Sequence, residues 1–193
     1  MKETIPLFKV FMSPTAKDKA GEVLDSGYIG QGAKVDEFEK QIGDYFGNNK
    51  VVTTNAGTSA LHLALHLLKK PKPHWNEDVF QGVAFVSHNW PGIEDGDEVL
   101  ATPLTCTASN WPIVANNMKI KWVDIDPTTL NMDLEDLERK MTPKTKAIMG
   151  VHWGGYPLDL DKIRDIRGRF RGKHGWAPAL IEDGAHAFGS KYK

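Results

Sequence analysis

The chain has 193 residues, of which 40% are hydrophobic and 25% charged, and its formal net charge at pH 7 is −1. This composition is typical of a globular protein of one domain or a large part of one, and it gives no indication of a nucleic-acid or membrane partner. A single cysteine, Cys106, excludes an internal disulfide. Because the first residues lack the apolar core of a signal peptide and no stretch has membrane-spanning length, we expect a cytoplasmic protein.

The first predicted elements are two helices within residues 13–46. Ser13 and Pro14 are typical of a helix N-cap followed by proline, which predicts a helix to about Leu24. Apolar residues at three- and four-residue intervals predict a second helix over 33–46. The glycine-rich segment 27–32 favours a connector over a phosphate loop, because it follows no clear strand and lacks the dinucleotide-binding spacing.

A short strand over 50–54 is predicted to turn directly into a helix over 60–70. The turn contains Gly57, Thr58 and Ser59. A glycine turn that opens a helix leaves backbone N–H groups unpaired at the positive end of the helix dipole, which makes an anion site. The alternative is that Thr58 or Ser59 only caps the helix.

Two potentially reactive features have simpler interpretations. His62 and His66 are four residues apart and could hold a metal ion, but no glutamate lies between them and no third ligand is evident. We therefore expect no metal site and a packed or solvated helix face. Cys106 follows a predicted strand and could be a nucleophile, but a buried structural cysteine is the simpler expectation.

Residues 71–97 are the least regular part of the sequence. One apolar run, 83–86, could be a strand, but its flanks are rich in turn residues and acidic residues. We interpret 71–97 as an elaborated connection that could contribute to substrate binding or to an interface.

The second half alternates strands with helices. Strands are predicted at 98–101, 119–123, 146–151 and 179–181, and helices at 109–117, 133–141 and 158–169. This alternation predicts a largely parallel, doubly wound α/β sheet. Six cations within residues 162–173 favour a solvated helix face and the loop after it, with a patch for a phosphate-bearing ligand as the alternative.

The last predicted strand delivers Glu182 and Asp183 to its carboxyl end, followed by two small residues and His186. In a parallel α/β sheet, ligands bind at that edge. Small residues beside a carboxylate leave room for a flat ligand. The alternative is an aspartate that caps the next helix and a histidine that is an ordinary loop residue.

With these segments aligned, the chain resembles the DegT/DnrJ/EryC1/StrS sugar aminotransferases, pyridoxal-phosphate enzymes of fold type I. The motifs that carry the resemblance are 27–30 with 38–39, 55–61, 96–99, 122–126, 144–148, 152–155 and 182–186. The resemblance implies a three-layer α/β fold with a mostly parallel sheet, the large domain of fold type I, incomplete at its C-terminus. It covers the N-terminal half of a typical member.

The resemblance also implies roles for individual residues in binding pyridoxal 5′-phosphate (PLP). Gly57, Thr58 and Ser59 would bind its phosphate, and Asp183 would pair with the pyridinium nitrogen. His186 would lie by the phenolic oxygen. Cys106 occupies the position where the family usually stacks an aromatic ring on the cofactor, so this chain offers less stacking area there.

The family's Schiff-base lysine is expected beyond Lys193, as is the small C-terminal domain. Lys191 and Lys193 follow the Asp183 motif too soon to serve as that lysine. We therefore expect residues 1–193 to be an N-terminal portion with no catalytic lysine of its own, inactive alone.

The activity implied by the resemblance is transamination of a nucleotide-linked keto-sugar with glutamate as the amino donor. It also implies a homodimer, or completion by a C-terminal polypeptide. Trp75, Trp90 and Trp111 are candidates for an interface, but they could equally be core residues. A sugar dehydratase of the same family, with histidine in place of the lysine, is one alternative; a binding or regulatory module that has lost catalysis is another. A poor glycine fingerprint makes a nicotinamide-dependent enzyme remote.

Overall fold

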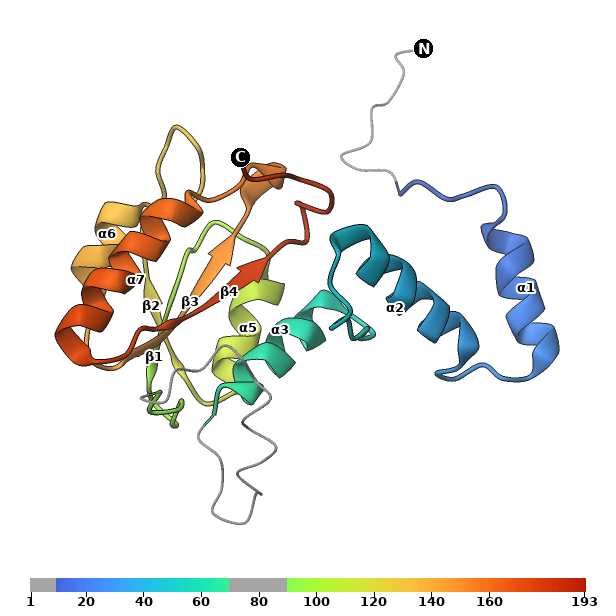
Figure 1. The fold of residues 1–193 in the computed structure, drawn as a ribbon, viewed down its shortest axis with the longest axis horizontal. Coiled ribbons are helices and arrows are strands. Elements are labelled where there is room, and N and C mark those ends of the chain that lie inside the picture. Colours follow the sequence, from blue (N-terminus) through green and yellow to red (C-terminus); the bar gives the residue numbers. More distant parts are fainter. Residues whose placement is uncertain (1–9, 70–89) are drawn as a thin grey trace. The chain divides into compact units, whose positions relative to one another are not determined.

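The computed structural model describes residues 10–69 and 90–193. These residues divide into two compact units, one ending at Thr53 and the other beginning at Thr54 (Figure 1). Most of the segment 71–97, including the possible strand at 83–86, lies outside the described residues, as does Trp75.

The first unit contains two helices, α1 (Ala16–Ser26) and α2 (Ala33–Phe46). The predicted bounds of α2 are confirmed. Each helix ends at a glycine in the left-handed region, Gly27 with φ 74° and Gly47 with φ 65°. This backbone conformation suits glycine because it has no Cβ to clash with the following carbonyl.

Two predictions in this unit are wrong. Ser13 is not the N-cap of α1, because the helix begins after Thr15. Residues 50–54 form no strand, although their apolar residues favoured one. The N–H and hydroxyl of Thr53 both donate to Oε1 of Glu39, at 2.7 and 2.8 Å, so a side chain takes the backbone donor that a strand would pair. These bonds, the backbone one foremost, hold the pKa of Glu39 below its usual value.

The second unit is built on a four-stranded sheet in which all strands are parallel. In sheet order, the strands are β2 (Lys119–Trp122), β1 (Glu98–Ala101), β3 (Thr145–Val151) and β4 (Ala179–Asp183). The helices are α3 (Gly57–Leu67), α5 (Thr107–Ala115), α6 (Leu134–Lys140) and α7 (Leu160–His174), with a short 3₁₀ turn η1 (Trp153–Gly155). The predicted doubly wound sheet is confirmed.

Helices cover both faces of this sheet, which gives three layers (Figure 1). Alternate side chains of each strand point to opposite faces. On β1, Val99 packs with α3 and α5, whereas Leu100 packs with α6 and α7. On β3, Met149 and Ile148 divide in the same way. The strands therefore have apolar residues on both faces, as buried parallel strands do.

The helix bounds differ from prediction most at α3 and α7, and α3 also ends at Leu67, three residues before its predicted end. Helix α3 begins at Gly57, three residues before the predicted start, so the glycine turn is itself helical. Helix α7 continues to His174 and ends at Gly175 with φ 79°, so the cationic run lies on the helix and not partly in a loop. Within the described ranges, no helix has the length and apolar content needed to cross a membrane.

Asp136 joins α6 to the end of β2. Its side chain is only 2% exposed, accepts the Asp124 N–H at 2.8 Å and forms ion pairs with Arg139 and Lys140. Burial raises the pKa of Asp136, but the Asp124 hydrogen bond and the two cations outweigh burial and hold the pKa below its usual value.

We expect Asp136→Asn to destabilise the protein in a pH-dependent way. The folded-state pKa lies below the unfolded value of about 4, so the carboxylate stabilises the fold above that pH, and the contribution is lost as the pH falls through the folded-state pKa. The variant should lose about 1–3 kcal/mol at pH 7, and the difference should shrink in acid. Urea unfolding at pH 7 and below pH 4 measures both values; the exposed Asp36→Asn is the control. A pH-independent difference would contradict this account.

Candidate functional site

The elements that carry the predicted site residues end or begin at the carboxyl edge of the sheet. Asp183 is the last residue of β4, and Cys106 lies in the connection from β1 to α5. Helix α3 ends beside the segment that leads into β1. The N–H of Ile93 in that segment donates to Leu68 O at the end of the helix. The opposite end of α3, with Gly57, therefore lies at the carboxyl edge. In α/β sheets this is the edge where ligands bind.

Asp183 is buried, with 9% of its surface exposed. Its Oδ2 accepts a hydrogen bond from Ser109 Oγ at 2.6 Å, and its Oδ1 accepts one from Ala185 N at 3.1 Å. Among the described residues, no cationic side chain forms an ion pair with it. The helix-cap alternative is wrong, because no helix follows β4 in the described chain and the carboxylate bonds within its own turn.

His186 is exposed and is held by the turn that follows β3. Its Nδ1 accepts a hydrogen bond from Gly154 N at 3.3 Å, and its ring meets the edge of Trp153 at a centroid distance of 5.7 Å. Because Nδ1 is the acceptor, the neutral ring carries its proton on Nε2. This arrangement leaves Nε2–H as a donor for a ligand.

The start of α3 offers backbone donors. Its N-cap is Ala56, and no side chain caps the helix, so the alternative that Thr58 or Ser59 is the cap is wrong. No acceptor in the described part of the chain takes the N–H groups of Gly57 and Thr58. The Ser59 hydroxyl donates to Asn55 Oδ1 at 2.8 Å, so its proton is already committed within the turn. Backbone donors, more than the Ser59 hydroxyl, form this anion site.

Cys106 is exposed, so the expectation of a buried structural cysteine is wrong. It is the N-cap residue of α5, with extended backbone and no side-chain cap. Its thiol therefore stands at the same edge as Asp183, at the position where the resemblance implies contact with the cofactor ring.

His62 and His66 share one face of α3, as their spacing predicted. With Thr58, Ser59 and Trp111, they line an open hollow of about 460 Å³ that also includes Leu63. Trp111 is 62% exposed and is therefore not a core residue. The described residues contain no group of three or more His, Cys, Asp or Glu side chains that could hold a metal ion.

Glu182 and Asp183 are neighbours in the sequence, but the strand directs their two carboxylates apart. Glu182 Oε2 accepts a hydrogen bond from His152 Nε2 at 3.1 Å, while His152 Nδ1 accepts from Leu158 N at 3.1 Å. The period of two along a strand, which sends successive side chains to opposite faces, could have predicted this separation. Glu182 is thus bound to a buried histidine and is not a second carboxylate of the site.

Two residues of the site, Thr105 and Ser109, were not predicted from the sequence. Their hydroxyl oxygens lie 2.7 Å apart, and Ser109 is 1% exposed. A spacing of four residues at the start of a helix places two hydroxyls on one face. That spacing was the available signal, but nothing in the sequence showed that Asp183, far along the chain, would meet this face.

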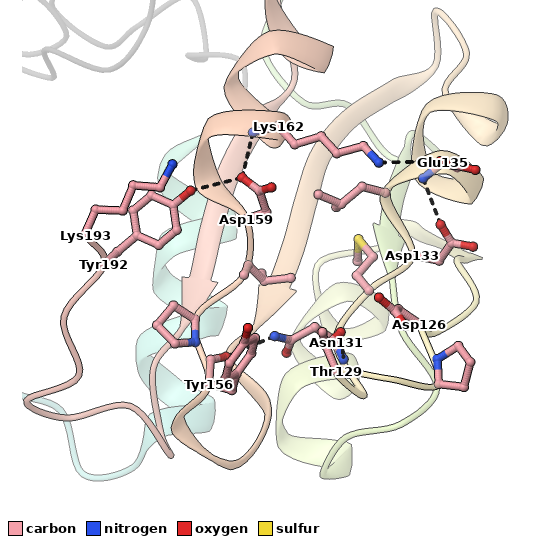
Figure 2. A pocket seen from close by; sticks show the side chains of 15 residues that line it. Asp126, Thr129, Asn131, Asp133, Glu135, Tyr156, Asp159, Lys162, Tyr192 and Lys193 are labelled. Carbon is pink, nitrogen blue, oxygen red and sulfur yellow. Dashed lines mark hydrogen bonds and ion pairs between the residues drawn. The ribbon is translucent and has the colours of Figure 1, made fainter.

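A second cavity, of about 580 Å³, lies among the connections that follow β2 and β3 (Figure 2). Asp159 faces it and accepts hydrogen bonds from Tyr192 OH and Lys162 N, each at 3.0 Å. Lys162 also forms an ion pair with Glu135 at 3.7 Å. Acidic side chains outnumber cationic ones in the lining, and none of the residues predicted to contact the cofactor contributes to it.

The sequence matches a known enzyme family over most of its length. The model of the DegT/DnrJ/EryC1/StrS aminotransferase family matches residues 12–74 and 82–193. The chain belongs to this family. The resemblance found in the sequence is confirmed, and the match spans both described units.

Solved structures support the fold assignment. AtS13 from Actinomadura melliaura is 50% identical with a TM-score of 0.82, and the sugar aminotransferase CalS13 from Micromonospora echinospora is 42% identical with a TM-score of 0.81; each match covers 96% of this chain and 44% of the other. A GDP-4-keto-6-deoxymannose-3-dehydratase, solved with a trapped PLP-glutamate geminal diamine, is 26% identical with a TM-score of 0.78, covering 98% of this chain and 43% of that one. The fold type I architecture is thereby confirmed.

The chain spans less than half the length of the relatives it matches. The shares are 42%, 37% and 44% for three curated relatives. The family and fold are therefore established, whereas the roles of Gly57, Thr58, Ser59, Cys106, Asp183 and His186 stay predictions.

We expect Gly155→Ala to disturb His186 more than Gly154→Ala does. Both glycines have positive φ, 82° and 58°, which costs another residue about 1–2 kcal/mol. Only at Gly155 would an added Cβ meet the His186 backbone, 2.8 Å from its carbonyl oxygen; at Gly154 nothing lies within 4 Å. Urea unfolding measures the loss of stability in each variant, and the NMR signals of the His186 ring measure its displacement. Equal ring shifts in both variants would show that Gly155 does not position His186.

Proposed function

We propose that this chain forms the cofactor-binding part of a PLP-dependent enzyme that transfers an amino group from glutamate to a nucleotide-linked keto-sugar. The observation that carries the proposal is the buried Asp183 carboxylate at the carboxyl edge of the sheet. The chain belongs to a family of sugar aminotransferases. The GDP-4-keto-6-deoxymannose-3-dehydratase that shares its fold was solved with a trapped PLP-glutamate geminal diamine.

The residues present fit PLP. A buried carboxylate is costly unless a cation or several donors compensate it, and Asp183 has two neutral donors but no cation among the described residues. A protonated pyridine nitrogen would supply the missing positive partner. The free N–H groups of Gly57 and Thr58, at the positive end of α3, suit a phosphate.

PLP, when bound, supplies an electron sink for the carbanion that amino transfer requires. The residues of this chain would hold PLP in place and would determine the protonation of its ring nitrogen. Asp183 would accept a hydrogen bond from the ring nitrogen and would favour its protonated form. His186 Nε2–H would donate to the phenolic oxygen, while the N–H groups of Gly57 and Thr58 would bind the phosphate. Cys106 would lie against the ring and would give less contact area than an aromatic side chain.

We further propose that the covalent lysine comes from a segment outside these 193 residues, in a C-terminal polypeptide or in a longer form of the chain. In support, the Lys193 ammonium pairs with Asp161 at the start of α7. The second contributor to the site would then be this segment, a second copy of the chain, or both.

The dehydratase remains the second candidate because one such enzyme shares this fold at 26% identity. Both candidates use the same Asp183 site, and they differ in what happens to the sugar. An aminotransferase adds nitrogen from glutamate to the sugar, whereas a dehydratase removes a hydroxyl group from it. A regulatory module would bind the ligand and produce neither product.

The product distinguishes these three functions. The protein, together with its complementing segment, is incubated with PLP, ¹⁵N-glutamate and a nucleotide-linked 4-keto-6-deoxy-sugar, and the sugar is analysed by mass spectrometry. We expect a sugar that carries ¹⁵N. A deoxygenated sugar without ¹⁵N would favour the dehydratase, and an unchanged sugar despite PLP binding would favour the regulatory module.

We expect Asp183→Asn to weaken PLP binding. Asparagine has nearly the same shape but no charge to pair with a protonated ring nitrogen, so the PLP dissociation constant should rise at least about tenfold, equivalent to about 1.4 kcal/mol. Absorbance titration measures it, with the exposed Asp165→Asn on α7 as control. Unchanged PLP affinity in Asp183→Asn would contradict the proposed role.

A further inference from the structure

We infer that Thr105 and Ser109 are positioning residues that orient the Asp183 carboxylate through a relay of hydroxyl hydrogen bonds. This inference rests on the proposed function, in which Asp183 contacts the pyridine ring of PLP. It assigns a role to two side chains that themselves need not touch the cofactor.

The direction of the relay follows from counting protons. Ser109 Oγ lies 2.6 Å from Asp183 Oδ2, and an ionised carboxylate can only accept, so Ser109 donates to it. A hydroxyl has one proton. Thr105 Oγ1, 2.7 Å from Ser109 Oγ, must therefore be the donor in the second bond. Thr105 thus donates to Ser109, and Ser109 donates to Asp183.

The relay holds one side of the carboxylate while the backbone holds the other. Ser109 and its bond come from the first turn of α5, whereas the Ala185 N–H that binds Oδ1 belongs to the turn after β4. Two donors from separate elements resist rotation of the carboxylate about its Cβ–Cγ bond. Each oxygen still has lone-pair capacity for another donor.

Burial strengthens the hydrogen bond that orients the Asp183 carboxylate. Ser109 is 1% exposed and Asp183 is 9% exposed, so their hydrogen bond lies in a medium of low dielectric constant. Hydrogen bonds to an ionised group are shorter and stronger than neutral ones, and the 2.6 Å distance fits this class. Because both donors are neutral, they orient the carboxylate without cancelling the charge that would attract a protonated ring.

The sheet offers a matched control at its opposite edge. Thr142 Oγ1 donates to Glu98 Oε2 at 2.7 Å, also a hydroxyl bond to a partly buried carboxylate. Glu98 begins β1, whereas Asp183 ends β4, so this pair lies at the amino edge. Thr142→Val removes a comparable hydrogen bond far from the proposed cofactor.

The test compares Ser109→Ala, Ser109→Thr, Thr105→Val and Thr142→Val in the purified protein. Its readouts are the PLP dissociation constant, the visible circular dichroism of bound PLP, which reports ring orientation, and urea unfolding. We expect Ser109→Ala to raise the dissociation constant about tenfold, the equivalent of one hydrogen bond to a charged group. It should also change the dichroism, while Ser109→Thr restores both readouts in part.

Thr105→Val should have a smaller effect in the same direction, and it keeps the inference testable if Ser109→Ala fails to fold. Thr142→Val should lower stability but leave both PLP readouts at wild-type values. If Ser109→Ala and Thr105→Val lose stability as Thr142→Val does but bind PLP like the wild type, the inference is overturned and the proposed function stands. If the wild-type protein does not bind PLP, the proposed function fails, and the inference fails with it.

Discussion

The hydrogen bond between Ser109 and Asp183 joins the two elements on which the candidate site depends. It places a charged carboxylate, 9% exposed, at the end of a buried strand, where an uncompensated charge would be costly. The parallel register of β3 and β4 pairs Val151 with Asp183 and so places that carboxylate at the carboxyl end of both strands. Packing of α5 on the same face then brings Ser109 within reach. The site is therefore a consequence of how the layers pack and not only of one motif.

The turn after β3 completes this edge. His152 N donates to Asp183 O, which extends the pairing of β3 with β4 by one residue, and Gly154 N then binds the His186 ring. Because successive residues of β4 face opposite sides, Glu182 binds His152 while Asp183 binds Ser109. One strand end thus supplies a structural carboxylate on one face and a candidate ligand carboxylate on the other. The chemistry depends on this division.

The sequence predicted the parts that depend on local pattern. Alternating apolar runs and amphipathic segments predicted the parallel sheet and most helices, and the small residues around Asp183 indicated a ligand edge. Prediction from the sequence failed where a residue distant in the chain binds a backbone or side-chain group. Glu39 takes the Thr53 N–H and prevents a strand, and Ser109 meets an aspartate 74 residues away. Neither contact has a periodic signal. Cys106 was predicted as buried because cysteine usually is, whereas the structure exposes it at the N-cap of α5.

The most direct test of this account is a crystal structure of the protein with PLP. We expect the ring nitrogen within hydrogen-bond distance of Asp183, about 2.7–2.9 Å, and the phosphate against the N–H groups of Gly57 and Thr58. His186 Nε2 should face the phenolic oxygen. PLP bound with its ring nitrogen away from Asp183, or with its phosphate away from the start of α3, would contradict the central claim that this sheet edge is a cofactor site.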